Sequence, residues 1–328
     1  MTPSNIHISV ISPVYRAAEC LEELYRRLVS ELEGITADFE IILVEDCGGD
    51  HSWQIIQRLA TLDERVRGIQ FSRNYGQHYA ITAGLDHARG DYVIVMDCDL
   101  QDRPEDIHRL YKEAQRGYDI VLARRTQRHE PFLKRLSGSL FYLIFNYLTD
   151  VKFDKAVGGF CILSKKVVDA ISAYRESSRF LMAFVNSVGF PTSFIETQQA
   201  ERYQGKSSYS LRRLLSHAFN TSLGFSAKPL RIAINIGAVM ACVSFISAIL
   251  VYGLATFGTL EVSGWASLMI SLWFLSGLIL AQIGIVGIYL GLVFHQTKNR
   301  PLYIVRRDTD SDKNQLGEDE REIESVIP

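Results

Sequence analysis

Two long apolar stretches near the C-terminus constrain the fold of this chain more than any other feature. They cover residues 232–256 and 265–294, and neither contains a charged residue. Each exceeds the roughly 20 residues that a helix needs to cross the hydrocarbon core of a bilayer. Two buried core helices are the alternative, but soluble helices rarely stay apolar on every face for so long. The sequence therefore predicts a hairpin of two transmembrane helices.

Charges beside these stretches predict their orientation. The connecting segment 257–264 has one charged residue, Glu261, whereas basic residues flank the pair on the outside: Lys228, Arg231, His295, Lys298, Arg300, Arg306 and Arg307. Positively charged flanks stay on the cytoplasmic side of a membrane. We expect a multi-pass protein of the inner (cytoplasmic) membrane, with the large N-terminal domain and both termini in the cytoplasm. The N-terminus does not have the pattern of a signal peptide.

Composition excludes several classes of function. A chain of 328 residues is long enough for more than one domain. Its formal charge of -2 lacks the basic excess of a nucleic-acid-binding protein, so no nucleic-acid partner is expected. The five cysteines include no CxxC pair, which argues against a disulfide framework and against a zinc site.

Strand-like and helix-like periods alternate over residues 6–125. Runs such as "IHISVISPVY" and "FEIILVED" are typical of strands, and "AAECLEELYRRLVSELEG" between them has apolar residues three and four apart. The alternation predicts an α/β domain with a mostly parallel, doubly wound sheet. Ligands of such sheets bind beyond the carboxyl ends of the strands.

Two segments mix basic residues with apolar ones at helical spacing, at 132–149 and 209–225. They could lie in the membrane surface as amphipathic helices or pack on the domain. The predicted organisation is a domain at 1–208 that includes the first segment, a juxtamembrane amphipathic helix at 209–229, two transmembrane helices within 230–295, and a cytoplasmic tail at 296–328 whose end is expected to be disordered.

The stretch "VMDCDLQD" ends a buried strand in carboxylates. If the extended backbone continues past Met96, Asp97, Asp99 and Gln101 project from one face, because residues two apart in a strand share a face. Two carboxylates and an amide oxygen suit Mg²⁺ or Mn²⁺. A solvated turn before a helix start at Pro104 is the alternative.

Another strand ends in "VEDCGGDHS". Glu45 and Asp46 can accept hydrogen bonds from a base or a ribose, and Gly48 and Gly49 permit close backbone approach. This pattern predicts a nucleotide site. The sequence has no GxGxxG fingerprint and no P-loop, so a dinucleotide dehydrogenase and a P-loop NTPase are not supported.

Four segments of the chain resemble the family-2 glycosyltransferases of the A-type fold. They are "ISPVYRAAECLEEL", "EIILVEDCGGD", "FSRNYGQHYAITAGLDHARGDYVIVMDCDLQDRPE" and "GYDIVLARR". Together with "ERYQGKSSYSLRRLL" and two spans, they resemble the polyisoprenyl-phosphate glycosyltransferases. The resemblance covers about residues 6–305.

The resemblance implies roles for named residues. It assigns the nucleotide and donor pocket to Pro13, Tyr15, Glu45, Asp46, Arg73, Asn74, Gly76, Gln77 and Asp97. It assigns the metal that bridges the diphosphate to Asp97, Asp99 and Gln101, and the phosphates of donor and lipid acceptor to Arg125, Arg202, Ser207 and Tyr209. Asp99, Arg125 and Arg202 are the implied catalytic residues.

Three segments depart from the motifs of the family. Its "DDGS" is "EDCG" at 45–48 here, its frequent "GDFR" is "GGFC" at 158–161, and its "SKY" is "SSY" at 207–209, one position after Lys206. The second departure removes an acidic and a basic side chain. We expect the three to affect the identity of the sugar more than the class of reaction.

The implied reaction is an inverting transfer of a sugar from a nucleotide diphosphate, with UDP as the expected nucleotide, to a polyisoprenyl phosphate such as undecaprenyl phosphate. The product is a lipid-linked sugar for cell-envelope glycans. The acceptor phosphate is largely ionised at neutral pH, so no strong general base is needed. Two alternatives are a processive polysaccharide synthase and a non-catalytic scaffold that binds nucleotide sugars. A homo-oligomer is implied by the resemblance alone.

Overall fold

A computed structural model describes residues 6–126, 154, 156–198, 226, 228–256 and 264–311. The described residues form two compact units. We call the first the α/β unit; it comprises the described part of the N-terminal domain together with residues 301–311. We call the second the helical hairpin; it lies within residues 226–300.

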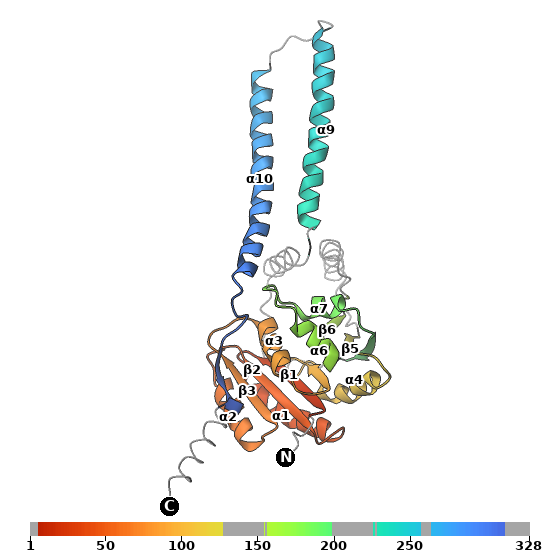
Figure 1. Ribbon diagram of the computed structural model, residues 1–328, viewed down its shortest axis with the longest axis vertical. Helices are drawn as coiled ribbons and strands as arrows, with labels where there is room; N and C mark the ends of the chain where they lie inside the picture. The colour runs from red at the N-terminus through yellow and green to blue at the C-terminus, as the bar shows by residue number, and fades with distance from the viewer. Residues whose placement is uncertain are drawn as a thin grey trace, which may run out of the picture. The chain divides into compact units, whose positions relative to one another are not determined.

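One eight-stranded sheet forms the centre of the α/β unit, with the strand order β7-β5-β6-β4-β1-β2-β3-β8 (Figure 1). The strands are β1 (Ile8–Val14), β2 (Phe39–Glu45), β3 (Val66–Phe71), β4 (Tyr92–Val95), β5 (Ile120–Arg125), β6 (Val157–Ser164), β7 (Thr192–Thr197) and β8 (Val305–Asp308). Neighbouring strands are parallel in the pairs β1–β2, β1–β4, β2–β3 and β5–β7. The prediction of an α/β fold with a mostly parallel sheet is confirmed.

Helices cover both faces of this sheet. They are α1 (Ala18–Glu33), α2 (Ser52–Leu62), α3 (Gln77–His87), the 3₁₀ turn η1 (Pro104–Asp106), α4 (Ile107–Ala114), α6 (Lys165–Ser172) and α7 (Leu181–Ser187). The leucines of α1 and the apolar residues of α2 and α4 share one core with β1 and β2. On the other face α3 packs so closely on β1 that a Cβ at Gly84 would lie 2.2 Å from Ile11 Cγ2.

The sheet differs from a simple doubly wound one at β6. This strand lies between β4 and β5 and runs antiparallel to both. Strands β4 and β5 are therefore consecutive in the sequence but are not paired in the sheet. The alternation of strands and helices over residues 6–125 gives no sign of this insertion, because β6 comes from beyond the alternating region.

The segment after the hairpin differs from the expected tail. Val305–Asp308 forms β8, which pairs antiparallel with β3 at the edge of the sheet. Residues 301–311 therefore belong to the α/β unit, and the prediction that residues 296–328 form only a tail is wrong for them. Residues 312–328 lie outside the described part of the chain.

The helical hairpin consists of α9 (Lys228–Thr256) and α10 (Trp265–Thr297), which run side by side (Figure 1). Gln282 Nε2 donates to the carbonyl of Ala233 at 3.3 Å, and Tyr289 Oη donates to the carbonyl of Ser226 at 2.7 Å. Gly237 leaves room for the first contact, because a Cβ there would lie 2.8 Å from Gln282 Nε2.

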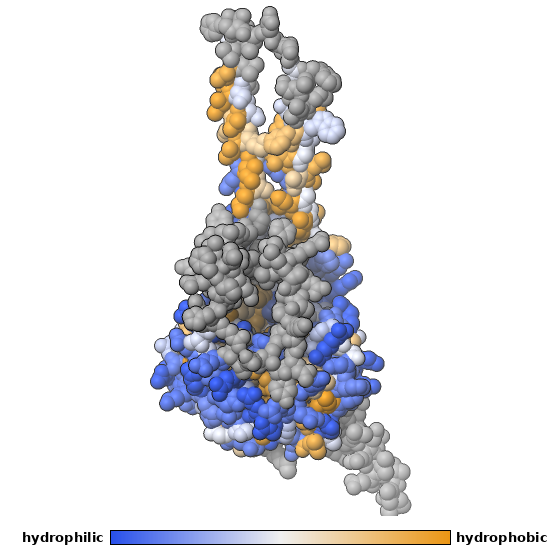
Figure 2. Space-filling view, turned by 180° about the vertical axis from the view of Figure 1, so that it is seen from behind, coloured by the Kyte–Doolittle hydropathy of each residue, from blue (hydrophilic) through white to orange (hydrophobic). Residues whose placement is uncertain are grey.

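Both helices expose apolar side chains along their length (Figure 2). Their most apolar windows, Leu230–Ser247 and Ser271–Thr297, are 6% and 0% buried. Core helices of a soluble protein are mostly buried, so that alternative does not fit. By length and composition both helices can cross a membrane.

Candidate functional site

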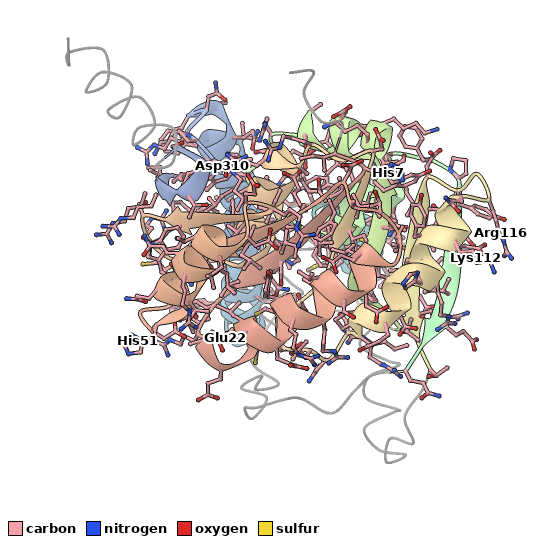
Figure 3. All side chains as sticks on the ribbon, turned by 90° about the horizontal axis from the view of Figure 1, so that it is seen from below. His7, Glu22, His51, Lys112, Arg116 and Asp310 are labelled. Atoms are coloured by element: carbon pink, nitrogen blue, oxygen red, sulfur yellow. The ribbon has the colours of Figure 1, made fainter. Side chains whose placement is uncertain are left out.

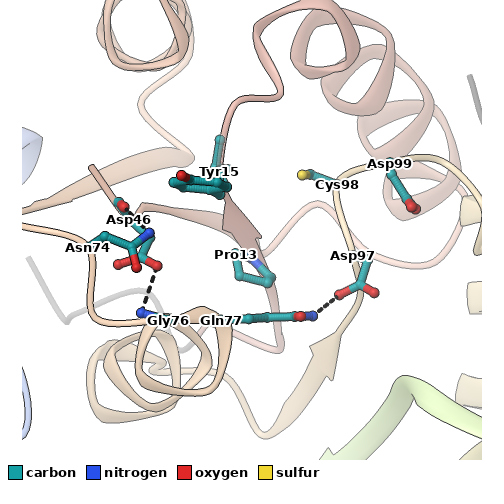
Figure 4. Close-up of a pocket in the computed structure, with 10 residues that line it drawn as sticks. Pro13, Tyr15, Asp46, Asn74, Gly76, Gln77, Asp97, Cys98 and Asp99 are labelled. Carbon is teal, nitrogen blue, oxygen red and sulfur yellow. Dashed lines mark hydrogen bonds between the residues drawn. The ribbon is translucent and has the colours of Figure 1, made fainter. Parts of the chain in front are cut away.

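A pocket of ≈ 330 Å³ lies at the carboxyl ends of β1 and β2 and at the start of α3 (Figure 4). Open sheets bind their ligands at this edge. Most of the predicted donor-site residues that the structure describes meet here. The lining residues are Pro13, Val14, Tyr15, Asp46, Asn74, Gly76, Gln77, Asp97, Cys98 and Asp99.

Asp46 organises one wall of the pocket. Its carboxylate accepts hydrogen bonds from the backbone N–H of Tyr75 at 2.6 Å and of Gly76 at 2.8 Å, and its carbonyl accepts one from Asn74 Nδ2 at 3.1 Å. Burial raises the pKa of Asp46, while the two N–H groups act in the opposite direction. Because both carboxylate oxygens are engaged, Asp46 shapes the loop at residues 72–76, which presents Asn74 and Gly76 to the pocket.

Two predicted nucleotide residues lie elsewhere. Glu45 is buried and does not line the pocket; it accepts hydrogen bonds from the Gly48 N–H at 2.6 Å and from Gln70 Nε2 at 3.1 Å. Arg73 is exposed, and its guanidinium lies 4.0 Å from the centre of the Tyr75 ring. In this structure Glu45 supports the turn after β2, whereas Arg73 belongs to the loop at residues 72–76 and has an exposed side chain.

Asp97 and Asp99 lie together at the opposite wall of the pocket (Figure 4). The prediction that an extended backbone past Met96 brings them together is wrong. Strand β4 ends at Val95, and the backbone turns at Leu100, where φ is 59°. A turn thus brings the two carboxylates to the pocket. Gln101 is not among the lining residues; its backbone N–H donates to Asp99 Oδ1 at 3.1 Å.

Asp97 is a weaker acid than an ordinary aspartate. Burial raises its pKa to about 6, and the nearby charges of Asp102 and Asp99 act in the same direction. Gln77 Nε2, from the first turn of α3, donates to Asp97 Oδ1 at 2.6 Å and holds the carboxylate in place. The surroundings of Asp97 therefore disfavour its ionised form.

A divalent cation fits these residues. Carboxylate oxygens are the ligands that Mg²⁺ and Mn²⁺ prefer, and a cation would offset the repulsion between Asp97 and Asp99. No cluster of three or more His, Cys, Asp or Glu side chains that could enclose a metal occurs among the described residues. The two aspartates would therefore supply only part of a coordination shell.

Arg125, at the end of β5, forms an ion pair with Asp102. Its Nη2 lies 3.3 Å from Asp102 Oδ1, and Asp102 is 5% exposed. Gly158 gives the guanidinium room, because a Cβ there would lie 2.9 Å from Arg125 Nη2. Arg125 does not line the pocket itself. Asp102 does not line the pocket either, so its carboxylate acts as the ion-pair partner of Arg125.

Buried polar atoms mark the same place. Arg125 Nε and Asp102 Oδ2 are both buried and have no hydrogen-bond partner within the described residues. Burial raises the pKa of Asp102, while Arg125 lowers it. The Arg125 side chain as a whole is 34% exposed, and the accessible N–H groups of a guanidinium are suited to a phosphate oxygen.

The remaining predicted residues, Arg202, Ser207 and Tyr209, lie outside the described residues, as do Lys206 and the amphipathic segments at 132–149 and 209–225. Sequence reasoning missed Cys98, which lines the pocket. In an extended strand Cys98 would point away from Asp97 and Asp99. Nothing in the residue pattern indicated the turn at Leu100 that changes this geometry.

Comparisons with known proteins agree on one family. The model of "Glycosyl transferase family 2" matches residues 9–171. A "Prophage bactoprenol glucosyl transferase homolog" of Escherichia coli (strain K12) is 37% identical over 92% of this chain and 98% of its own length. A "Bactoprenol glucosyl transferase" of Shigella phage SfII is 36% identical over 92% and 97%. The "Uncharacterized glycosyltransferase YkcC" of Bacillus subtilis (strain 168) is 33% identical over 96% and 98%.

Proposed function

This chain belongs to glycosyl transferase family 2, and we propose that it transfers a sugar from a nucleotide diphosphate to a polyisoprenyl phosphate. The expected nucleotide is UDP and the expected lipid is undecaprenyl phosphate. One observation carries the proposal: the chain combines a pocket containing Asp97 and Asp99 with two exposed apolar helices long enough to cross a membrane. The names of the bactoprenol glucosyl transferase relatives support the transfer of a sugar and the class of lipid acceptor.

The residues divide the chemical work. Asp97 and Asp99 would hold Mg²⁺ or Mn²⁺, with Gln101 as the third proposed ligand. The cation would supply charge to stabilise the leaving diphosphate. Gln77 keeps Asp97 oriented, and the loop at residues 72–76 shapes the nucleotide side. We propose that Arg125 holds a phosphate, together with Arg202, Ser207 and Tyr209 on the acceptor side.

The nucleophile needs no strong base. A phosphate monoester has its second pKa near 6, so an acceptor oxygen is already anionic at pH 7. Catalysis then rests on holding this oxygen in line with the anomeric carbon and on stabilising the leaving group. In-line attack inverts the configuration at the anomeric carbon.

The acceptor explains the apolar helices. Removing an isoprenoid chain from a bilayer costs about 0.8 kcal/mol for each buried CH₂ group, so the enzyme must work at the membrane. We propose that α9 and α10 cross the inner membrane and keep the α/β unit on its cytoplasmic side, where nucleotide sugars are made. A homo-oligomer remains part of the proposal.

The test is an incubation of the purified full chain with undecaprenyl phosphate and a panel of UDP- and dTDP-sugars. A lipid-linked sugar formed from at least one donor is expected, and EDTA should abolish it until Mg²⁺ or Mn²⁺ is restored. Asp99→Ala should lower the rate at least about a hundredfold, because it removes a metal ligand.

Glu22→Ala is the matched control, since Glu22 is an exposed acid on α1 (Figure 3). Lack of a lipid product with every donor would refute the transferase. Repeated addition of sugars to one acceptor would favour the processive synthase instead. Nucleotide binding without transfer would favour the non-catalytic scaffold, although the names of the relatives argue against it.

A further inference from the structure

Residues 303–310, which we call the C-terminal strap, bind along the edge of the sheet at β3. The carbonyl of Ile304 accepts a hydrogen bond from the Ser72 N–H at 3.0 Å. Asp308 receives Arg67 Nε at 3.1 Å and Nη2 at 2.6 Å, and Thr309 Oγ1 accepts from the Gly68 N–H at 2.9 Å. Figure 3 shows this segment against the sheet, with Asp310 labelled near its end.

These contacts are stronger than an incidental edge pairing. Asp308 and Arg67 side chains are only 12% and 15% exposed, so water screens their bidentate ion pair weakly. Burial raises the pKa of Asp308, whereas the hydrogen bonds and the charge of Arg67 lower it. The net effect is a lowered pKa of Asp308. The strap is thus fixed to the α/β unit along its whole length.

Tyr303 begins the strap and makes two kinds of contact. Its ring stacks on Phe71, with centroids 5.2 Å apart and planes at 23°. Its hydroxyl donates to Asp86 Oδ2 at 2.8 Å, near the end of α3. Burial and Asp86 raise the pKa of Tyr303, so the hydroxyl stays protonated and remains a donor.

A continuous set of contacts joins Tyr303 to the pocket. Phe71 meets the ring of Tyr75 edge to face, with centroids 5.4 Å apart. The N–H groups of Tyr75 and Gly76 donate to the Asp46 carboxylate, which lines the pocket. Ser72, which begins this loop, is the residue bonded to Ile304.

We propose that Tyr303 is a positioning residue for the nucleotide-sugar donor, acting through Phe71 and the loop at residues 72–76. The inference rests on the proposed function for its substrate, but its structural basis stands apart from it. The chain supplies this support from beyond its apolar helices, since only residues 298–302 separate the end of α10 from Tyr303. The proposed support for the pocket loop is therefore available only after the whole hairpin has been synthesised.

Hydrogen–deuterium exchange on the full chain without ligand tests the support directly. Amides in a peptide covering residues 72–76 should exchange about tenfold faster in Tyr303→Ala, which loses the stacked ring and the hydrogen bond. Tyr303→Phe keeps the ring and loses only the hydroxyl, so we expect an increase of about threefold. Peptides from β1 should exchange as in the wild type. Arg306→Gln, at an exposed position of β8, should change neither region.

Transfer kinetics give the second readout. Tyr303→Ala should raise the KM for the nucleotide sugar about tenfold while kcat and the KM for the polyisoprenyl phosphate change less than about twofold. Tyr303→Phe should recover most of the donor affinity. A merely structural role would instead lower the amount of active enzyme and leave both KM values unchanged.

Wild-type exchange rates at residues 72–76 in Tyr303→Ala would overturn the inference, as would an equal increase throughout the α/β unit. A parallel loss of affinity for donor and acceptor would overturn it too. If the wild type transfers no sugar, the proposed function fails, but the exchange experiment still decides whether Tyr303 supports the loop.

Discussion

At the scale of single residues, Asp97 couples the charge of the site to the stability of the fold. Its pKa of about 6 lies above the value of about 3.9 for an exposed aspartate, because burial and the charges of Asp102 and Asp99 disfavour the ionised form. Between these two pH values the folded state binds more protons than the unfolded state. The free energy of unfolding therefore falls as the pH rises through this window.

The sign of this coupling predicts an unusual variant. Without metal at pH 8, Asp97→Asn should raise the Tm by about 3 °C or more, because the amide removes a charge that the folded site disfavours. Below about pH 3 the difference should become small, since Asp97 is then largely neutral in both the folded and the unfolded state. Added Mg²⁺ or Mn²⁺ should raise the Tm of the wild type but not that of the variant.

Thermal unfolding in detergent with EDTA measures this effect, and transfer activity should be lost in the same protein. Asp38→Asn serves as the control, because Asp38 is an exposed aspartate outside the pocket. If the Asp97→Asn protein is no more stable than the wild type at pH 8, then the ionised carboxylate of Asp97 does not destabilise the fold.

Strand ends were enough to predict Asp46, Asp97 and Asp99, and the family resemblance implied Pro13, Tyr15, Asn74, Gly76 and Gln77; all eight residues line the pocket. The contacts among them could not be predicted. Whether Glu45 faces a nucleotide or the Gly48 N–H depends on one turn of the backbone. The pairing of Arg125 with Asp102 depends on which strands are neighbours, and adjacent positions in the sequence do not contain that information.

At the scale of elements, strands β1 to β5 followed from their apolar runs, but β8 did not. Its sequence "VRRD" is mostly charged and resembles the polar tail after it. It becomes a strand because β3 offers unpaired N–H and C=O groups and because Arg67 binds Asp308. Such a strand is stabilised by tertiary contacts rather than by its own propensity.

The packing of α3 on β1 gives a prediction at this scale. Gly84→Ala would place a methyl group 2.2 Å from Ile11 Cγ2, so α3 would have to move away from the sheet. Overpacking of this kind costs about 1–3 kcal/mol, which exceeds the gain of about 1 kcal/mol from the better helix propensity of alanine.

We expect a fall of the Tm by several degrees and a higher KM for the nucleotide sugar, because α3 carries Gln77 at its first turn. Gly159→Ala is the matched control for stability, since a Cβ there meets no atom within 4 Å in the described structure. An unchanged Tm in Gly84→Ala would mean that α3 is packed more loosely than the structure indicates.

At the scale of the whole molecule, the pairing of β8 with β3 restricts how the chain can cross a membrane. Phe71 and Val305 are partners in one sheet, although α9 and α10 lie between them in the sequence. A bilayer cannot divide a hydrogen-bonded sheet, because its core leaves exposed backbone groups unsatisfied. The chain must therefore cross the membrane an even number of times between these residues.

Thiol labelling of intact spheroplasts tests this conclusion. Cys47 is exposed in the α/β unit, so a membrane-impermeant maleimide should label it only after lysis if that unit is cytoplasmic. A second protein, with Cys47→Ser and Leu260→Cys, carries its accessible thiol between the two apolar stretches and should be labelled before lysis. Cys242 is replaced by alanine in both proteins, so that each reports from one position.

Labelling of Cys47 in intact spheroplasts would place the α/β unit outside the cytoplasm, away from the proposed donors. Labelling of both thiols only after lysis would show that α9 and α10 do not cross the bilayer as a hairpin. Labelling at position 260 before lysis, with Cys47 labelled only after lysis, is the one result that satisfies the sheet, the apolar helices and a cytoplasmic nucleotide sugar together, because two crossings return the chain to the side from which it started.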